Sequence, residues 1–270
     1  MMFSTEILLK FFGSFLDQGS IAAMNYAVRI VFILVGFFGQ AVGMASFPFM
    51  AKLAAKGDME KLNQLINKTI CYIFISIPFS FLFMVTSHEI VLILFQRGRF
   101  DAAATAITSG ILPFFLVGTF AFCAQTIVAR GYYAVQNTLL PALFSTLCVG
   151  ASLPVLYLLM FTNALAAFAL FVCWNRKTGN GGSGLVYGFF LKMTGIGLGI
   201  FAILWYLRKA LLLVMPNDTL LSALGLCLIL GIVFLGLMAA AARMFHIQEI
   251  SVFFQRLLRT RTPDSSQKEK

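Results

Sequence analysis

Three polar residues whose side chains can bind a ligand interrupt a long apolar stretch near the start of the chain. Asn25 and Arg29 are four residues apart, and Gln40 follows Arg29 by eleven residues. A helix brings residues at both spacings back to one face. A charge on or inside a membrane span is unfavourable unless it meets water, a counter-charge or an anionic ligand. The spacing therefore predicts a polar stripe of the kind that lines a water-filled cavity.

Simpler roles are also open for these residues. A span needs only about 20 residues, and Ile30 to Met50 supplies that length without Arg29, which could then extend to the headgroups from the helix end. Gln40 alone could form a hydrogen bond between two helices. Lys192, near the start of a later apolar stretch, could extend its amine to the membrane surface in the same way.

Other kinds of chemistry find little support in the sequence. The two histidines, His88 and His246, lie outside any cluster of the metal-ligand type. The ten acidic residues are spread over loops and ends, so no acid and base pair is expected inside a span. The glycine-rich segment 179–184 lacks the lysine and the strand of a phosphate-binding loop. We therefore expect no catalytic residue, no metal site and no cofactor, and we expect that the chain is not an enzyme.

The composition is that of an integral membrane protein. Of the 270 residues, 60% are hydrophobic and 11% are charged, and the mean hydropathy is +0.91, whereas soluble domains carry about 25% charged residues. The apolar runs are continuous rather than alternating, which indicates helices. The five cysteines have no paired spacing, so we expect no disulfides. The predicted fold class is all-α, a polytopic transmembrane helix bundle of about seven spanning helices plus a partial N-terminal one.

The helices that would position the polar stripe are separated by short polar segments. Prolines predict kinks at Pro78 and Pro113. Residues 141–174 fit one very long helix or two short ones, and we favour two, hinged near residues 161–163, because Pro154 is unfavourable inside a single helix. The predicted spans cover residues 24–50, 70–86, 105–129, two helices within 141–174, 185–207 and 219–242, with a polar, partly helical linker at 52–68 and a flexible loop at 175–184.

Alternating these spans assigns the basic residues to two faces. One face receives the lysines of segment 52–68, Arg130, segment 176–177 and the C-terminal tail, whereas the other receives Arg97, Arg99, Arg208 and Lys209. The richer face is predicted to be cytoplasmic, with the C-terminus inside. Basic residues in short loops suit membrane topology and anionic headgroups, so we expect a membrane partner and no nucleic acid.

Four segments of the chain form a set of motifs in a fixed order. They are Gly19-Ser20 with Asn25-Tyr26-Ala27-Val28-Arg29, Phe47 to Ala54, Leu94 to Phe100, and Gly131 to Thr138 with Pro141. In this order they resemble the tyrosine-alanine-x-arginine, proline-x-leucine-serine-like, phenylalanine-x-x-glycine-x-phenylalanine and phenylalanine-tyrosine-alanine-x-x-aspartate-threonine patterns of the MurJ (MviN) family of lipid II flippases, in the multidrug/oligosaccharidyl-lipid/polysaccharide exporter superfamily. The resemblance covers the chain up to about Pro154 and, more weakly, the last two spans.

The resemblance implies a protein that turns an undecaprenyl-diphosphate-linked peptidoglycan precursor across the bacterial cytoplasmic membrane by alternating access. Arg29 matches a cavity arginine that looks toward the substrate diphosphate, with Asn25 and Gln40 on the same face. Lys192 matches a basic position at the entrance of a lipid-facing groove. The implied organisation is a second lobe over residues 1–175, a flexible cytoplasmic loop over 176–184, two groove-forming spans over 185–245 and a basic cytoplasmic tail over 246–270.

The chain also departs from the family pattern. The family has fourteen spans, and this sequence resembles only the end of the seventh and those that follow, so we expect a C-terminal half that needs a complementary N-terminal lobe. Leu9 stands where an acidic cation ligand often occurs, and Asn137 replaces the usual aspartate. Two alternatives stay open: a flippase for another polyprenyl-linked saccharide, and a non-transporting membrane subunit that binds lipid or a partner.

Overall fold

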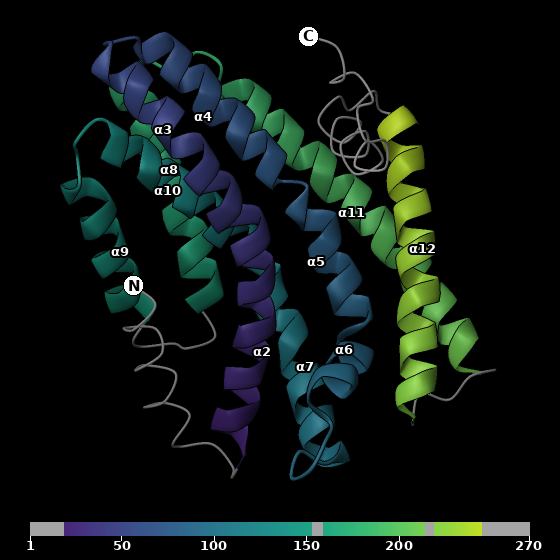
Figure 1. Cartoon of the computed structure of the whole chain (residues 1–270). Helices are drawn as coiled ribbons and strands as arrows, with labels where there is room; N and C mark the ends of the chain where they lie inside the picture. The colour runs from purple at the N-terminus through teal and green to yellow at the C-terminus, as the bar shows by residue number, and fades with distance from the viewer. Residues whose placement is uncertain (1–18, 153–158, 214–218, 245–270) are drawn as a thin grey trace, which may run out of the picture.

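The computed structural model describes residues 19–152, 159–213 and 219–244, and it places them in a bundle of long, roughly aligned helices (Figure 1). No strand occurs within these ranges, so the all-α prediction is confirmed. In chain order the helices are α2 (Ser20–Leu34), the π-helical η1 (Val35–Ala41), α3 (Val42–Ala55), α4 (Met59–Ile73), α5 (Ser76–Val85), α6 (Ser87–Phe95), α7 (Ala102–Val117), α8 (Thr119–Ala134), α9 (Leu139–Ser152), α10 (Leu159–Thr178), α11 (Ser183–Leu212) and α12 (Leu220–Met244).

The first three elements, α2, η1 and α3, run on as one helical segment of 36 residues. Their inner face packs against α7, α8 and α4, and it buries Ala27, Ile30 and Met50 completely. Gly39 in η1 permits a close approach to α8, because an added Cβ would lie 3.1 Å from the Cα of Cys123. The opposite face of this segment is open, and it carries the predicted polar residues.

The second span begins earlier than the sequence analysis predicted. Segment 52–68 was expected to be a polar, partly helical linker; in the structure α4 starts at Met59, after a turn in which Gly57 adopts a φ of 71°, and it runs on into the span. Asp58 caps the helix by accepting a hydrogen bond of 3.1 Å from the backbone of Lys61. The reason is amphipathic spacing, because Leu62 and Ile66 are buried beneath the polar residues.

Two prolines affect their helices differently. A break separates α4 from α5 at residues 74–75, shortly before Pro78, which has no N–H for the carbonyl of Phe74 four residues earlier; Ile77 donates to that carbonyl instead, over 3.1 Å. Pro113, by contrast, lies within α7, and the 43° bend between α7 and α8 falls at Gly118. The kink predicted at Pro113 is therefore displaced by about one turn of helix.

Segment 141–174 forms two helices, α9 and α10, as predicted. The predicted hinge at residues 161–163 is wrong, since those residues are helical in α10; residues 153–158, which include Pro154, lie outside the described part of the chain. The segment expected to be a flexible loop is also more ordered than its glycine content suggests. Helix α10 continues to Thr178, and the turn before α11 is fixed by Asn180, which is buried.

Buried amides hold this turn against α4. Asn67 and Asn180 exchange two side-chain hydrogen bonds of 2.9 Å, and Asn180 also donates to Asn175. One turn earlier in α4, Asn63 accepts a hydrogen bond of 2.9 Å from the indole of Trp174. Buried amides need such partners. The network therefore fixes the end of α10 and the start of α11 to α4.

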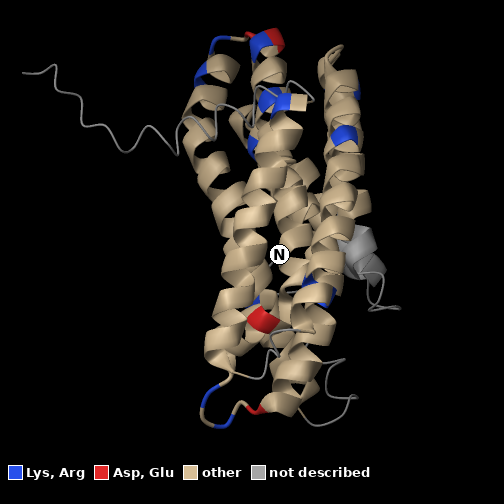
Figure 2. Ribbon diagram, turned by 90° about the vertical axis from the view of Figure 1, so that its right-hand side faces the viewer, with Lys and Arg blue, Asp and Glu red and all other residues tan. Residues whose placement is uncertain are grey.

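Helices α11 and α12 lie to one side of the bundle (Figure 1). Helix α11 packs mainly on α5, α12 and α4, and α12 also contacts α6. By length and apolar composition, four helices of the described residues can cross a membrane, or five if the bent pair α7 and α8 is one span. Basic residues gather mainly toward the two ends of the bundle (Figure 2). The predicted basic tail, residues 246–270, lies outside the described part of the chain.

Candidate functional site

The open face of α2, η1 and α3 carries the residues predicted to bind a ligand. Arg29 and Gln40 are both exposed on it, and Asn25 is half-buried at its start. Two large apolar side chains lie between them on the exposed face, Ile33 at 59% and Phe37 at 61% exposure. The structure thus brings Arg29 and Gln40 to one face, although that face is not a continuous polar stripe.

Arg29 lies beside an aromatic cluster. Its guanidinium carbon is 5.8 Å from the centre of the Tyr26 ring, within the range of a cation–π contact. Tyr26 in turn contacts Phe95 at 4.7 Å and Phe100 at 5.0 Å between ring centroids. No described carboxylate forms a salt bridge with Arg29. Within the described residues, the charge is therefore positioned by a ring and is not neutralised by a carboxylate.

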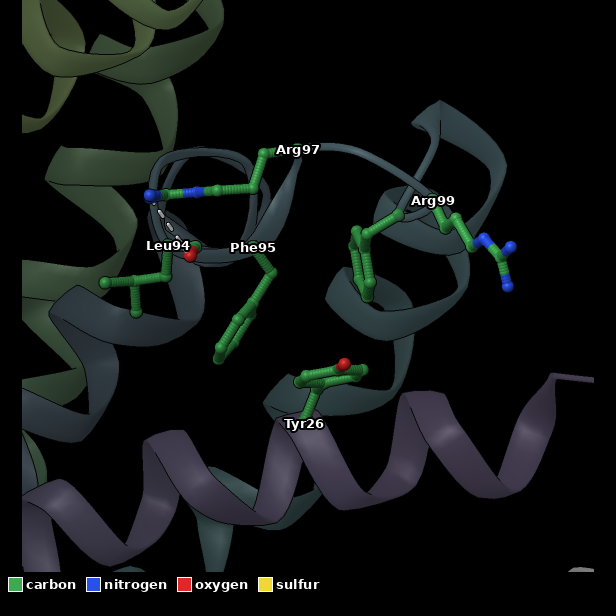
Figure 3. Close-up of a pocket in the computed structure, with 6 residues that line it drawn as sticks. Tyr26, Leu94, Phe95, Arg97 and Arg99 are labelled. Atoms are coloured by element: carbon green, nitrogen blue, oxygen red, sulfur yellow. Dashed lines mark hydrogen bonds between the residues drawn. The ribbon is translucent and has the colours of Figure 1, made fainter.

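The aromatic cluster borders an open pocket of about 420 Å³ between α2 and the turn from α6 to α7 (Figure 3). Arg97 and Arg99 also line it. Arg97 reaches back to the end of α6, where it donates to the carbonyls of Ile93 and Leu94 over 3.1 and 3.3 Å, and Arg99 points away from the pocket. These arginines do not converge on the pocket, which mainly serves to hold Tyr26.

The structure adds Arg130 to the candidate site. From α8 its Nη2 donates to Oε1 of Gln40 over 3.0 Å, and its Nη1 donates to the backbone oxygen of Gln40 over 3.5 Å. The sequence analysis placed Arg130 at a membrane face as a closing charge, which missed this role. The available signal was an arginine several residues inside the helix end, but its partner 90 residues away could not be read from the sequence.

Lys192 is not part of this site. It is half-buried on α11, which packs on α5, α12 and α4 rather than on the open face of α2 and α3. Arg29 and Lys192 therefore belong to different parts of the bundle.

The structure contains a buried ion pair that the sequence analysis did not predict. Glu89, on α6, is completely buried, and its Oε1 accepts hydrogen bonds from Nε and Nη2 of Arg208 over 3.0 and 2.7 Å. Arg208 belongs to α11, so the pair joins α11 to the core of the bundle. No group of three or more potential metal ligands occurs in the described residues. The site therefore consists of arginines held by neutral groups on one face, with a neutralised pair elsewhere.

A family model described as "Lipid II flippase MurJ" matches residues 2–175, well over half of the chain. The chain belongs to the MurJ family. The matched range includes Arg29, Gln40, Arg130 and Glu89, whereas Lys192 and Arg208 lie beyond it.

Curated relatives agree with this assignment. A probable lipid II flippase MurJ from Rhizobium tropici is 29% identical over 136 residues, which is 50% of this chain and 26% of the relative. One from Borreliella burgdorferi is 27% identical over 211 residues, 76% of this chain and 40% of the relative. One from Aquifex aeolicus is 32% identical over 131 residues, 48% of this chain and 25% of the relative. The chain thus matches well under half the length of these MurJ relatives.

A solved structure supports the fold. The lipid II flippase MurJ in an inward closed conformation superposes with a TM-score of 0.65 at 20% identity, over 89% of this chain and 51% of that chain. At that identity the likeness concerns the fold. The described helices therefore have the arrangement of about half of a MurJ structure.

Proposed function

We propose that this chain acts as one lobe of a lipid II flippase, which moves an undecaprenyl-diphosphate-linked peptidoglycan precursor across the bacterial cytoplasmic membrane. The observation that carries the proposal is Arg29, an exposed guanidinium on a candidate membrane span of a MurJ-family chain. Such a charge is unfavourable in lipid and is retained where it meets an anion or water. A guanidinium suits a diphosphate because it stays charged and donates parallel hydrogen bonds to phosphate oxygens.

Transport by alternating access would require a second lobe opposite this one. The face that carries Arg29 also exposes Phe37 and Met44 at 61% and 63%. A complementary lobe, on the same polypeptide or a separate one, would cover the apolar residues and enclose Arg29 in a cavity that opens to either side in turn. The likeness to about half of a solved flippase supports this arrangement.

The polyprenyl tail would lie outside that cavity. Helices α11 and α12 expose a largely apolar surface, which includes Leu191 at 74% and Leu228 at 65%. These residues would face a polyprenyl chain as readily as membrane lipid. Lys192, half-buried on α11, would then stand at the border of this surface and attract the phosphate end of the lipid.

Growth of a flippase-depleted bacterium tests the proposal. The chain is expressed with and without the N-terminal lobe of a MurJ relative, and insertion of both proteins in the membrane is verified. We expect restored growth only when both lobes are present. If both lobes are inserted and growth is not restored, the transport function is contradicted.

Substitutions of Arg29 then test the site. Arg29→Ala should abolish rescue because it removes the proposed diphosphate contact, and Arg29→Lys should weaken it because the charge remains without the planar fork. Arg99→Ala is the matched control, since Arg99 is exposed and points away from the aromatic pocket. Full rescue by Arg29→Ala would assign Arg29 to the membrane surface instead.

The orientation is proposed from the charges. The end with the α3–α4 and α10–α11 turns, which carries Lys52, Lys56, Arg176 and Lys177, would face the cytoplasm, as would the C-terminus. A C-terminal fusion to green fluorescent protein should therefore fluoresce, and a fusion to alkaline phosphatase should be inactive. An active alkaline phosphatase fusion and a dark fluorescent fusion would show that the C-terminus lies on the opposite side of the membrane.

A further inference from the structure

Arg130 of α8 lies at the border between the α3–α8 contact and the open face, in a fit that depends on a glycine. A Cβ added to Gly43 of α3 would lie 2.5 Å from Nη1 of Arg130 and 2.8 Å from its Cζ. The guanidinium therefore lies against the backbone of α3, where Gln40 accepts its hydrogen bonds through both its side chain and its carbonyl. Arg130 itself stays half-exposed. Its position is set by the protein and does not depend on a ligand.

The partners of Arg130 leave its charge uncompensated. An amide oxygen and a carbonyl oxygen accept hydrogen bonds but carry no net charge. No carboxylate of the described residues forms a salt bridge with Arg130. Holding an arginine between helices with neutral acceptors alone is unfavourable in an apolar environment. An anion that reaches this face would supply the missing countercharge.

Arg29 and Arg130 lie near the two ends of one row of exposed residues. Exposed residues recur along α2, η1 and α3 at helical spacing: Arg29, Ile33, Phe37, Gln40 and Met44. Gln40, which holds Arg130, is eleven residues beyond Arg29, or about 15 Å along the helix axis. Arg130 lies toward the proposed cytoplasmic end and Arg29 toward the other. Between them the face is apolar.

We propose that Arg130 is a second binding residue for the lipid-linked diphosphate, so that the headgroup passes between Arg130 and Arg29 as it crosses. This inference rests on the proposed function. Gln40 is a positioning residue, because it acts by holding the guanidinium of Arg130. The apolar middle of the face offers the diphosphate no polar partner. The diphosphate therefore binds either at Arg130 or at Arg29.

Gly43→Ala tests the placement of Arg130 without removing its charge. The added methyl group displaces the end of a flexible side chain, so the fold should be preserved while the guanidinium moves off Gln40. Gly36→Ala is the matched control, since it makes the same change in the same helical segment and its Cβ meets nothing within 4 Å. Thermal unfolding in detergent verifies that both variants are folded.

Binding is measured on the full purified chain by native mass spectrometry with undecaprenyl diphosphate, with undecaprenol and with phosphatidylglycerol. We expect Gly43→Ala and Arg130→Ala to weaken diphosphate binding by about tenfold to a hundredfold, the usual effect of losing a charged hydrogen bond. Arg130→Lys should weaken it less, and Gly36→Ala should not change it. Undecaprenol should bind equally to all variants. An equal loss of phosphatidylglycerol would show instead that Arg130 binds phospholipid headgroups in general.

Failure of this inference differs from failure of the proposed function. If Arg29→Ala abolishes binding or rescue while Gly43→Ala and Arg130→Ala leave both unchanged, Arg130 is not a binding residue and the flippase function stands. If the wild-type chain neither binds the diphosphate nor supports growth with a second lobe, both proposals fall. If it supports growth without measurable binding, unchanged rescue by Gly43→Ala overturns the role of Arg130.

Discussion

Two arginines of this bundle are held in opposite ways. Arg208 donates two hydrogen bonds to Glu89, whose carboxylate is completely buried at the contact of α6 with α11. Arg29 is exposed on α2, and its guanidinium carbon lies 5.8 Å from the centre of the Tyr26 ring. The first charge is neutralised within the protein and holds helices together. The second is positioned but not neutralised, which is the arrangement expected of a ligand-binding residue.

Two glycines, Gly197 on α11 and Gly43 on α3, also differ in what surrounds them. On the side of α11, a Cβ at Gly197 would lie 2.7 Å from the ring of Phe81, which is half-buried and contacts the ring of Phe201. At the contact of α3 with α8, a Cβ at Gly43 would lie 2.5 Å from Nη1 of Arg130, at the end of a long side chain. The first contact is with an aromatic ring, and the second is with a charged group that a methyl group can displace. Stability should therefore depend on the first region and ligand binding on the second.

The largest expected effect on stability is that of Glu89→Gln. The substitution leaves Arg208 without its countercharge, and breaking a buried pair in this way costs about 3 to 5 kcal/mol. Denaturant unfolding of the purified chain in detergent measures the change. Glu60→Gln is the control, because Glu60 is exposed on α4 and its loss should alter stability by less than about 0.5 kcal/mol.

A double variant sharpens this test. Glu89→Leu combined with Arg208→Leu removes both charges, and replacing a whole buried pair by apolar residues is often close to neutral. It should therefore be more stable than Glu89→Gln alone. Equal stability of Glu89→Gln and the wild type would show that the pair does not hold α6 and α11 together.

Gly197→Ala should have the next largest effect. The added methyl group must displace the ring of Phe81, and such overpacking costs about 1 to 3 kcal/mol. Gly195→Ala, on the same helix, meets nothing within 4 Å and should be neutral or slightly stabilising, since alanine favours helix. The unfolding midpoints of the two variants measure the difference. If the two variants have the same unfolding midpoint, α11 does not pack tightly on α5 at Gly197.

The sequence predicted the bundle better than it predicted the roles of polar residues. Continuous apolar runs locate the long helices because burial in lipid imposes length and composition on each span separately. The start of the second span was predicted too late in the chain because α4 is amphipathic, with Leu62 and Ile66 buried below exposed charges. A hydropathy reading registers the charges of such a helix and not its buried face.

Polar residues were harder to assign because their partners are remote in the chain. Glu89 was expected near an interface, but it is buried against Arg208, 119 residues away. Arg130 was expected at a helix end, but it crosses to Gln40, 90 residues away. Arg29 was singled out because a charge beside a long apolar run is visible in the sequence itself, and its contact with the Tyr26 ring is local to the helix. Local spacing reveals such a residue, whereas a contact between helices needs the packing.

The smallest expected effect on stability is that of Arg29→Ala, and it is the one that most sharply separates the two regions. Because Arg29 is exposed and forms no salt bridge with a described carboxylate, its removal should change the free energy of unfolding by less than about 0.5 kcal/mol. Arg208→Ala, measured in the same detergent, should be strongly destabilising because it leaves Glu89 buried without its countercharge. A chain that keeps its stability but loses rescue when Arg29 is replaced has a functional charge there. If Arg29→Ala destabilises the chain as much as Arg208→Ala does, Arg29 is a structural residue and the contrast between the two arginines fails.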